Sequence, residues 1–117
     1  MTDSESKTTK SVSEILRTVA SENAFYFYKG EGSPSGLKAS SLREFLYDIE
    51  SLDTETIYFH SQRHDFENWV RMLGDPTLAK QIHSVSSQGL TAEQIKSRLV
   101  RIVRMRVGKL KKLAHEA

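Results

Sequence analysis

The stretch that decides the fold is AFYFYK, residues 24–29, in which four aromatic side chains follow one another without interruption. Aromatic residues fit the pleated, half-buried surface of a sheet better than the side of a helix, so this stretch predicts a β-strand. Side chains alternate along a strand, which places Phe25 and Phe27 on one face and Tyr26 and Tyr28 on the other. The sheet is therefore expected to have one apolar face and one tyrosine-lined face.

Short amphipathic helices are predicted on both sides of this strand. Three capping-box patterns, in which Ser or Thr is followed three residues later by Glu or Gln, place helix starts after Ser11, Ser41 and Thr91. Asp75 followed by Pro76 marks another start, because aspartate caps a helix and proline suits its first position.

The remaining segments predict two more strands and one more helix. A short returning strand is expected at residues 37–39, after a turn-rich loop. Residues 56–60 alternate like a second half-buried strand, with Tyr58 and His60 on one face, and a helix follows at about 63–73. The pattern predicts an α+β fold, with a small antiparallel sheet packed against short helices and a long C-terminal helix behind them.

The length and composition fit one globular domain with polar ends. The chain has 117 residues, of which 38% are hydrophobic and 27% charged, so full-length disorder is not expected. We expect a disordered tail at residues 1–10, an α+β core domain at 11–88 and a basic amphipathic helix at 89–117.

Cysteine usage and hydropathy exclude several classes of protein. Without cysteine there are no disulfides, no cysteine-ligated zinc and no thiol catalysis, which agrees with a reducing cytoplasm. The longest apolar run, residues 24–28, falls far short of the roughly 20 residues that span a bilayer. The polar N-terminus predicts no signal peptide. We therefore expect a cytoplasmic protein that does not bind membranes.

Positive charge is concentrated near the C-terminus. Residues 91–117 carry eight Lys or Arg against two Glu, a balance of +6, whereas the first ninety residues have a balance of −4. A basic element of this kind is typical of one that contacts an acidic partner, most commonly nucleic acid. A solvated helix, or one that contacts the acidic body of a second subunit, has the same signature.

The long helix predicted at 92–115 has an apolar stripe with two explanations. It packs on its own domain, or it forms a seam between copies of the chain. We favour a homodimer or higher homo-oligomer, with the seam made by Ile95, Leu99, Ile102, Val103, Leu110 and Leu113. Arg106 lies within the stripe, so packing on its own domain would require it to reach an acid or extend to water.

No catalytic or metal site is predicted. His60 and His64 are four residues apart with Asp65 and Glu67 nearby, a pattern that binds metal on a single helix. Here the two histidines are expected on different elements, and nothing marks a nucleophile or a phosphate-binding loop. We therefore expect no enzyme activity, no cofactor or metal, and no small-molecule substrate.

The tyrosine face is the strongest functional signal. Flat aromatic surfaces rimmed by cations bind single-stranded nucleic acid, since bases stack on the rings and Lys or Arg neutralises phosphates. The predicted binding face combines Tyr26, Tyr28, Tyr58 and His60 with edge cations Lys29, Lys38, Arg63 and Arg71. Burial of the tyrosines with bonded hydroxyls is the alternative.

Four segments together resemble a family of small archaeal domains with an F-H-x-x-R-x-D-F-x-x-W core, close to the ThermoDBP-related single-stranded DNA-binding proteins: FYFY (25–28), SLREF (41–45), FHSQRHDFENW (59–69) and LGDPTLA (73–79). The resemblance implies an N-terminal α+β binding domain and a C-terminal oligomerisation helix. It further implies that Phe66 and Trp69 line or support an aromatic cleft, with Arg63 at its rim.

The resulting hypothesis is a non-enzymatic protein that binds single-stranded DNA or RNA and dimerises through its last helix. The alternative is a protein-interaction or oligomerisation module of the same fold with little or no nucleic-acid binding. A steep fall of oligonucleotide affinity with salt, together with losses on Tyr26→Ala and Tyr58→Ala, favours the first hypothesis. Tight self-association without oligonucleotide binding favours the second.

Overall fold

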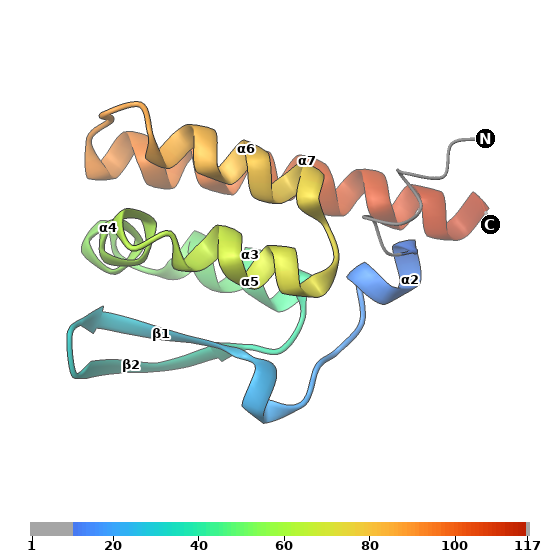
Figure 1. Cartoon of the computed structure of the whole chain (residues 1–117), viewed down its shortest axis with the longest axis horizontal. Helices are drawn as coiled ribbons and strands as arrows, with labels where there is room; N and C mark the ends of the chain where they lie inside the picture. The colour runs from blue at the N-terminus through green and yellow to red at the C-terminus, as the bar shows by residue number, and fades with distance from the viewer. Residues whose placement is uncertain (1–10, 117) are drawn as a thin grey trace.

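The computed structural model describes residues 11–116, and the tail predicted at 1–10 lies outside them. The fold is α+β, as predicted, and its elements form three layers (Figure 1): a β-hairpin, then α3, α4 and α5, then α6 packed along α7. The elements are α2 (Val12–Ile15), the 3₁₀ turn η1 (Ser21–Asn23), β1 (Phe25–Gly30), β2 (Ser33–Ala39), α3 (Leu42–Ser51), α4 (Thr54–Gln62), α5 (Asp65–Leu73), α6 (Pro76–Ser86) and α7 (Ala92–Glu116).

The aromatic stretch forms β1, and its faces are as the alternation predicted. Phe25 and Phe27 are buried in the core, whereas Tyr26 and Tyr28 are exposed. β1 pairs antiparallel with β2, with irregular register around Tyr28. The returning strand begins at Ser33 rather than Leu37, so the predicted loop contracts to a tight turn.

The strand predicted at 56–60 is wrong, because these residues form part of α4. Asp53 is the N-cap, and its Oδ1 accepts a hydrogen bond from the Thr56 N–H at 2.8 Å. In the helix Ile57, His60 and Ser61 are buried on one side, the i, i+3, i+4 spacing of a helical face. A cap and this buried face override the β-propensity of a Thr-Ile-Tyr-Phe run.

The remaining helix signals are confirmed. Ser11 makes the full capping box at α2, and Thr91 and Gln94 make its reciprocal bonds before α7. Asp75 caps α6 by accepting from the Leu78 N–H at 3.1 Å, with Pro76 at the first helical position. None of the helices in the described part of the chain combines the length and apolar character needed to cross a bilayer.

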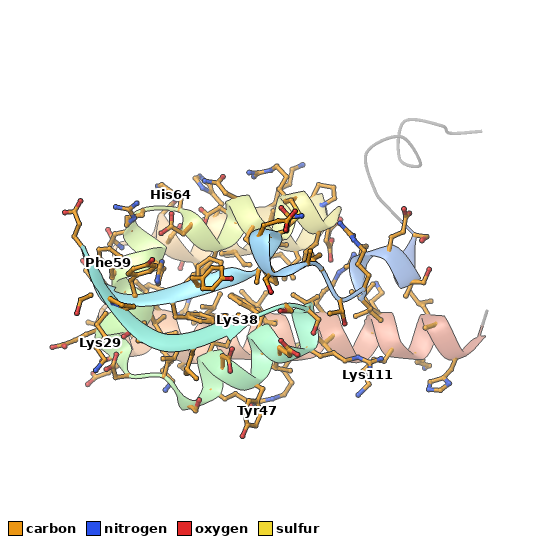
Figure 2. All side chains as sticks on the ribbon, turned by 90° about the horizontal axis from the view of Figure 1, so that it is seen from below. Lys29, Lys38, Tyr47, Phe59, His64 and Lys111 are labelled. Carbon is orange, nitrogen blue, oxygen red and sulfur yellow. The ribbon has the colours of Figure 1, made fainter. Side chains whose placement is uncertain are left out.

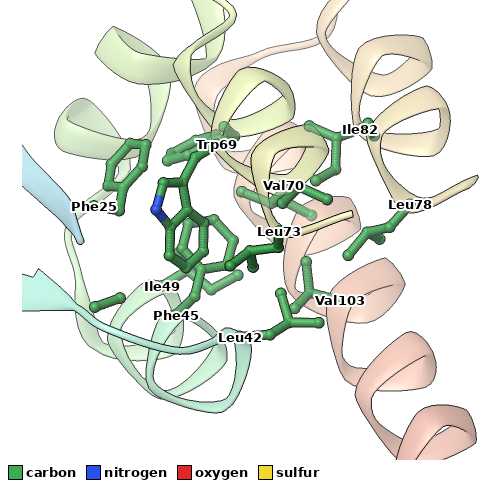
Figure 3. Close-up of a cluster of buried hydrophobic side chains, with 14 of the residues drawn as sticks. Phe25, Leu42, Phe45, Ile49, Trp69, Val70, Leu73, Leu78, Ile82 and Val103 are labelled. Carbon is green, nitrogen blue, oxygen red and sulfur yellow. The ribbon is translucent and has the colours of Figure 1, made fainter. Parts of the chain in front are cut away.

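The α7 stripe packs on its own domain at most of the residues that were predicted to form a seam between copies. Ile95, Leu99, Val103 and Leu110 are buried in the domain's own core, where α7 packs against α2, α3, α4 and α6. Figure 3 shows the same arrangement, with Val103 of α7 facing the cluster around Leu42. Helix α7 is thus part of the core that residues 11–88 were expected to form alone.

Two other members of the stripe are less buried than these four. Arg106, which lies within the stripe, also packs within the chain. Ile102 is half-buried and Leu113 is exposed. The Arg106 guanidinium binds the fully buried Asp75 carboxylate through two hydrogen bonds, Nε–Oδ2 at 2.7 Å and Nη2–Oδ1 at 2.9 Å. The arginine within the apolar stripe therefore reaches an acid of its own domain.

We expect Leu99→Ala to lower the free energy of unfolding by about 2–5 kcal/mol, because Leu99 is 1% exposed and its loss leaves a cavity. Urea unfolding at two protein concentrations measures this. The matched control on the same helix is Leu113→Ala, where the side chain is 40% exposed and the change should stay small. Destabilisation that depends on protein concentration would instead indicate a seam between copies.

Candidate functional site

A pocket of about 380 Å³ opens at the edge of β1 that does not pair with β2. Its walls come from β1, the hairpin turn, the end of α4 and the start of α5. Figure 2 shows Phe59 of α4 beside the hairpin. The pocket is lined by Ala24, Phe25, Tyr26, Tyr28, Gly30, Glu31, Gly32, Phe59, His60, Arg63, Asp65 and Trp69.

His60 connects the three elements that form the pocket. The Tyr28 N–H donates to His60 Nε2 at 2.8 Å, so this nitrogen is the acceptor of a neutral ring. The proton then lies on Nδ1, which donates to Asp65 Oδ2 at 2.9 Å. One buried imidazole thus joins β1 to α4 and α5.

The environment of His60 favours its neutral form. Burial lowers the pKa of His60 below its ordinary value, and Asp65 opposes that shift without reversing it. Because both ring nitrogens are hydrogen-bonded and the side chain is buried, His60 holds the pocket walls together and has no ring nitrogen free to bind a ligand. This corrects the prediction that His60 shares an exposed sheet face with Tyr58.

The solvent-facing part of the pocket is aromatic and carries one guanidinium. Tyr26 and Tyr28 are 45% and 37% exposed. The Arg63 Cζ lies 5.2 Å from the centroid of the half-buried Phe59 ring, within cation–π range. Arg63 Nε also donates to Asp65 Oδ2 at 3.1 Å, which holds the guanidinium near the pocket.

Trp69 is a lining residue of the pocket that is fixed at both its polar and its apolar parts. Its indole Nε1 donates to the Asn23 carbonyl at 2.8 Å, and the ring packs against Phe25 and Phe45. The indole belongs to the aromatic cluster of Figure 3 and contributes to the wall of the pocket. This position satisfies the one polar group of the side chain while the ring stays in the core.

Five of the ten predicted binding residues line this pocket: Tyr26, Tyr28, His60, Arg63 and Trp69. Lys38 lies beside them, because its Nζ is 6.0 Å from the Tyr26 ring centroid. The structure therefore brings the hairpin tyrosines and the motif residues of α4 and α5 together, though not on one sheet face.

The other four predicted residues lie elsewhere. Phe66 is fully buried and cannot stack on a ligand, and Tyr58 is exposed on α4 but does not line the pocket. Lys29 instead interacts with Asp53. The hydrogen bonds with Thr56 are the main cause of the lowered pKa of Asp53, and the positive charge of Lys29 adds to that shift. Arg71 donates to the Asn68 side chain at 3.3 Å on α5.

Sequence reasoning missed Phe59, Asp65 and Glu31 as lining residues. Reading 56–60 as a strand placed Phe59 on the core face. A helical reading separates Phe59 and Arg63 by one turn, and on that basis the stacked pair was predictable.

Comparison with known proteins identifies the family of the chain. The model of DUF5752, described as a family of unknown function, matches residues 3–104, and the chain belongs to this family. Comparisons with curated proteins and with solved structures each gave no significant match.

We expect the stability of the protein to fall as the pH drops below about 6.5. The lowered pKa of His60 means that the unfolded state binds a proton that the folded state excludes, so stability falls towards the folded-state pKa. The slope from this group is at most about 1.4 kcal/mol per pH unit. Denaturant unfolding at a series of pH values measures it.

The matched control is His60→Gln, which keeps an acceptor for the Tyr28 N–H but cannot titrate. Its stability deficit relative to the wild type should narrow as the pH falls through this window. A deficit that stays constant from neutral to mildly acidic pH would contradict the neutral, buried state of His60.

Proposed function

We propose that the protein is a non-enzymatic binder of single-stranded nucleic acid, which receives an unpaired base in the pocket between β1 and α4. The observation that carries the proposal is the convergence of Tyr26, Tyr28 and the Arg63–Phe59 pair around one solvent-open pocket. Stacking on rings of this kind contributes about 1–3 kcal/mol per base and tolerates any sequence.

The arrangement favours stacking over charge as the source of affinity. The cations beside the pocket are Arg63 and Lys38, and Asp65 partly neutralises the first. Two phosphate contacts on a single strand correspond to a slope of about −1.4 in log K against log salt. The steep salt dependence that the sequence predicted is therefore replaced in this proposal by a base-stacking interaction that depends only weakly on salt.

The basic C-terminal helix has a smaller part in this proposal than its charge indicates. Arg106 binds Asp75, Arg104 pairs with Glu50 at 2.6 Å, and Lys96 donates to the Leu52 carbonyl. Helix α7 also lies in the layer opposite the hairpin (Figure 1). Several cations of α7 thus hold elements of the domain together and do not form a basic surface beside the pocket.

The resemblance of residues 59–69 to the ThermoDBP-related single-stranded DNA-binding proteins is consistent with this function. In that resemblance Phe66 and Trp69 line or support the aromatic cleft with Arg63 at its rim; here Trp69 and Arg63 line the pocket, whereas Phe66 is buried in the core. Contacts to the sugar decide between DNA and RNA, and the binding measurement distinguishes the two.

We expect Tyr28→Ala and Arg63→Gln each to weaken binding of a labelled single-stranded oligonucleotide by about 5- to 100-fold, because each removes a stacking surface or its cation. Fluorescence anisotropy at low and near-physiological salt measures this, with the duplex as competitor. Quenching of the single tryptophan, which lines the pocket, provides a label-free readout.

The matched control is Tyr47→Ala on α3. Tyr47 is 72% exposed and points away from the hairpin (Figure 2), so its removal should leave affinity unchanged. Equal losses for Tyr47 and Tyr28, or binding that ignores strandedness, would refute the pocket as the site. Absence of binding in the wild type would favour the protein-interaction module.

A further inference from the structure

A second cluster of chemically active side chains lies on another face of α5, where α5 packs on α6. It consists of His64, Glu67 and His83, and its three ligand atoms lie within 4.8 Å of one another. His64 Nδ1 is 2.8 Å and His83 Nδ1 is 3.2 Å from the same oxygen, Glu67 Oε2. None of the three lines the aromatic pocket.

Glu67 is buried without full satisfaction of its carboxylate. Its side chain is only 3% exposed. Oε2 receives both imidazoles, with Ser86 Oγ at 3.4 Å, whereas Oε1 has no hydrogen-bond partner among the described residues. A buried carboxylate ordinarily has its oxygens paired or bound to a metal, so the unpartnered oxygen of Glu67 calls for an explanation.

The backbone at His64 is arranged for the cluster rather than for capping. His64 precedes α5 in the left-handed conformation, with φ of 63°, which is uncommon outside glycine, although histidine adopts it more often than most residues. Residues in this N-cap position normally bond the helix with the side chain, and His64 does not. Its imidazole contacts Glu67 instead.

We propose that His64, Glu67 and His83 form a three-ligand site for a divalent transition-metal ion, with zinc the ion that best suits the donor set. Two imidazoles and one carboxylate are the ligands of open, catalytic-type zinc sites. A tetrahedral ion with bonds of about 2.1 Å separates its ligand atoms by about 3.4 Å. Here the two imidazole Nδ1 atoms lie 2.8 and 3.2 Å from Glu67 Oε2, and no two of the three atoms are more than 4.8 Å apart. Rotation of the two exposed imidazoles would bring all three atoms to tetrahedral spacing.

The surroundings of the cluster leave one side of the ion open and orient one of its ligands. His64 and His83 are half-exposed, so the outer side of the ion stays open to water or an external ligand. When Nδ1 of a neutral imidazole binds the ion, its proton moves to Nε2. For His83 that nitrogen lies 3.4 Å from Ser87 Oγ, an acceptor that would orient the ring. The bound ion would join α5 to α6.

The test is isothermal titration calorimetry of the full chain with zinc chloride, after removal of metal with a chelator. The expected result is saturable binding of one ion per chain and a rise in melting temperature, with no response to magnesium. Cobalt(II) in place of zinc should give the visible absorption of a low-coordinate site.

The decisive variants are His83→Gln and His64→Asn, the second chosen because asparagine also tolerates the left-handed conformation. Each should weaken zinc binding by more than about tenfold, the least that loss of an outer-shell partner costs. The control is His115→Gln, a histidine of α7 outside the cluster, which should leave binding unchanged. Circular dichroism confirms that the variants fold.

Zinc affinity unchanged in His83→Gln would overturn the proposal, as would no saturable binding in the wild type. Because His64 and His83 lie outside the aromatic pocket, the oligonucleotide experiment and this one fail independently.

Discussion

The structure depends on how a two-stranded hairpin is held against a bundle of helices. Two strands alone are barely stable in water, and only one edge of β1 is paired with β2. The other edge of β1 has no neighbouring strand, and His60 provides a hydrogen-bond partner there: it accepts from the Tyr28 N–H and donates to Asp65. Phe25 and Phe27 then pack against Phe45 and Phe66 beneath it. The pocket exists because this buried imidazole, rather than a third strand, closes the sheet edge.

On the opposite side of the domain, a charged pair joins helices α6 and α7. Asp75 is fully buried, caps α6 and receives both hydrogen bonds of Arg106. Removal of one partner from such a pair is costly because the other charge stays buried. This explains a basic residue in an apolar stripe, and it shows that part of the +6 tail serves the fold.

Local signals made most of the fold predictable, and long-range packing accounts for the errors. The caps at Ser11, Asp75 and Thr91 are properties of a few adjacent residues, and they hold in the structure. Residues 56–60 have strand propensity, but Asp53 and a buried face facing β1 and α7 make them helical. The stripe of α7 is equally suited to a copy or to its own core. Only the three-dimensional positions of α2, α3, α4 and α6 decide between them.

The candidate site was predictable in its residue types but not in its geometry, and α5 shows why. Successive residues of a helix are rotated by 100°, so Asp65, Phe66 and Glu67 point in three directions. Asp65 faces His60 and the pocket, Phe66 enters the core, and Glu67 meets His64 and His83. His60 and His64 lie on different elements, as the sequence predicted, and each histidine binds a different acid on a different face. A short segment dense in His, Asp and Glu thus contributes to two separate side-chain clusters, and the spacing of these residues along the sequence does not separate the two.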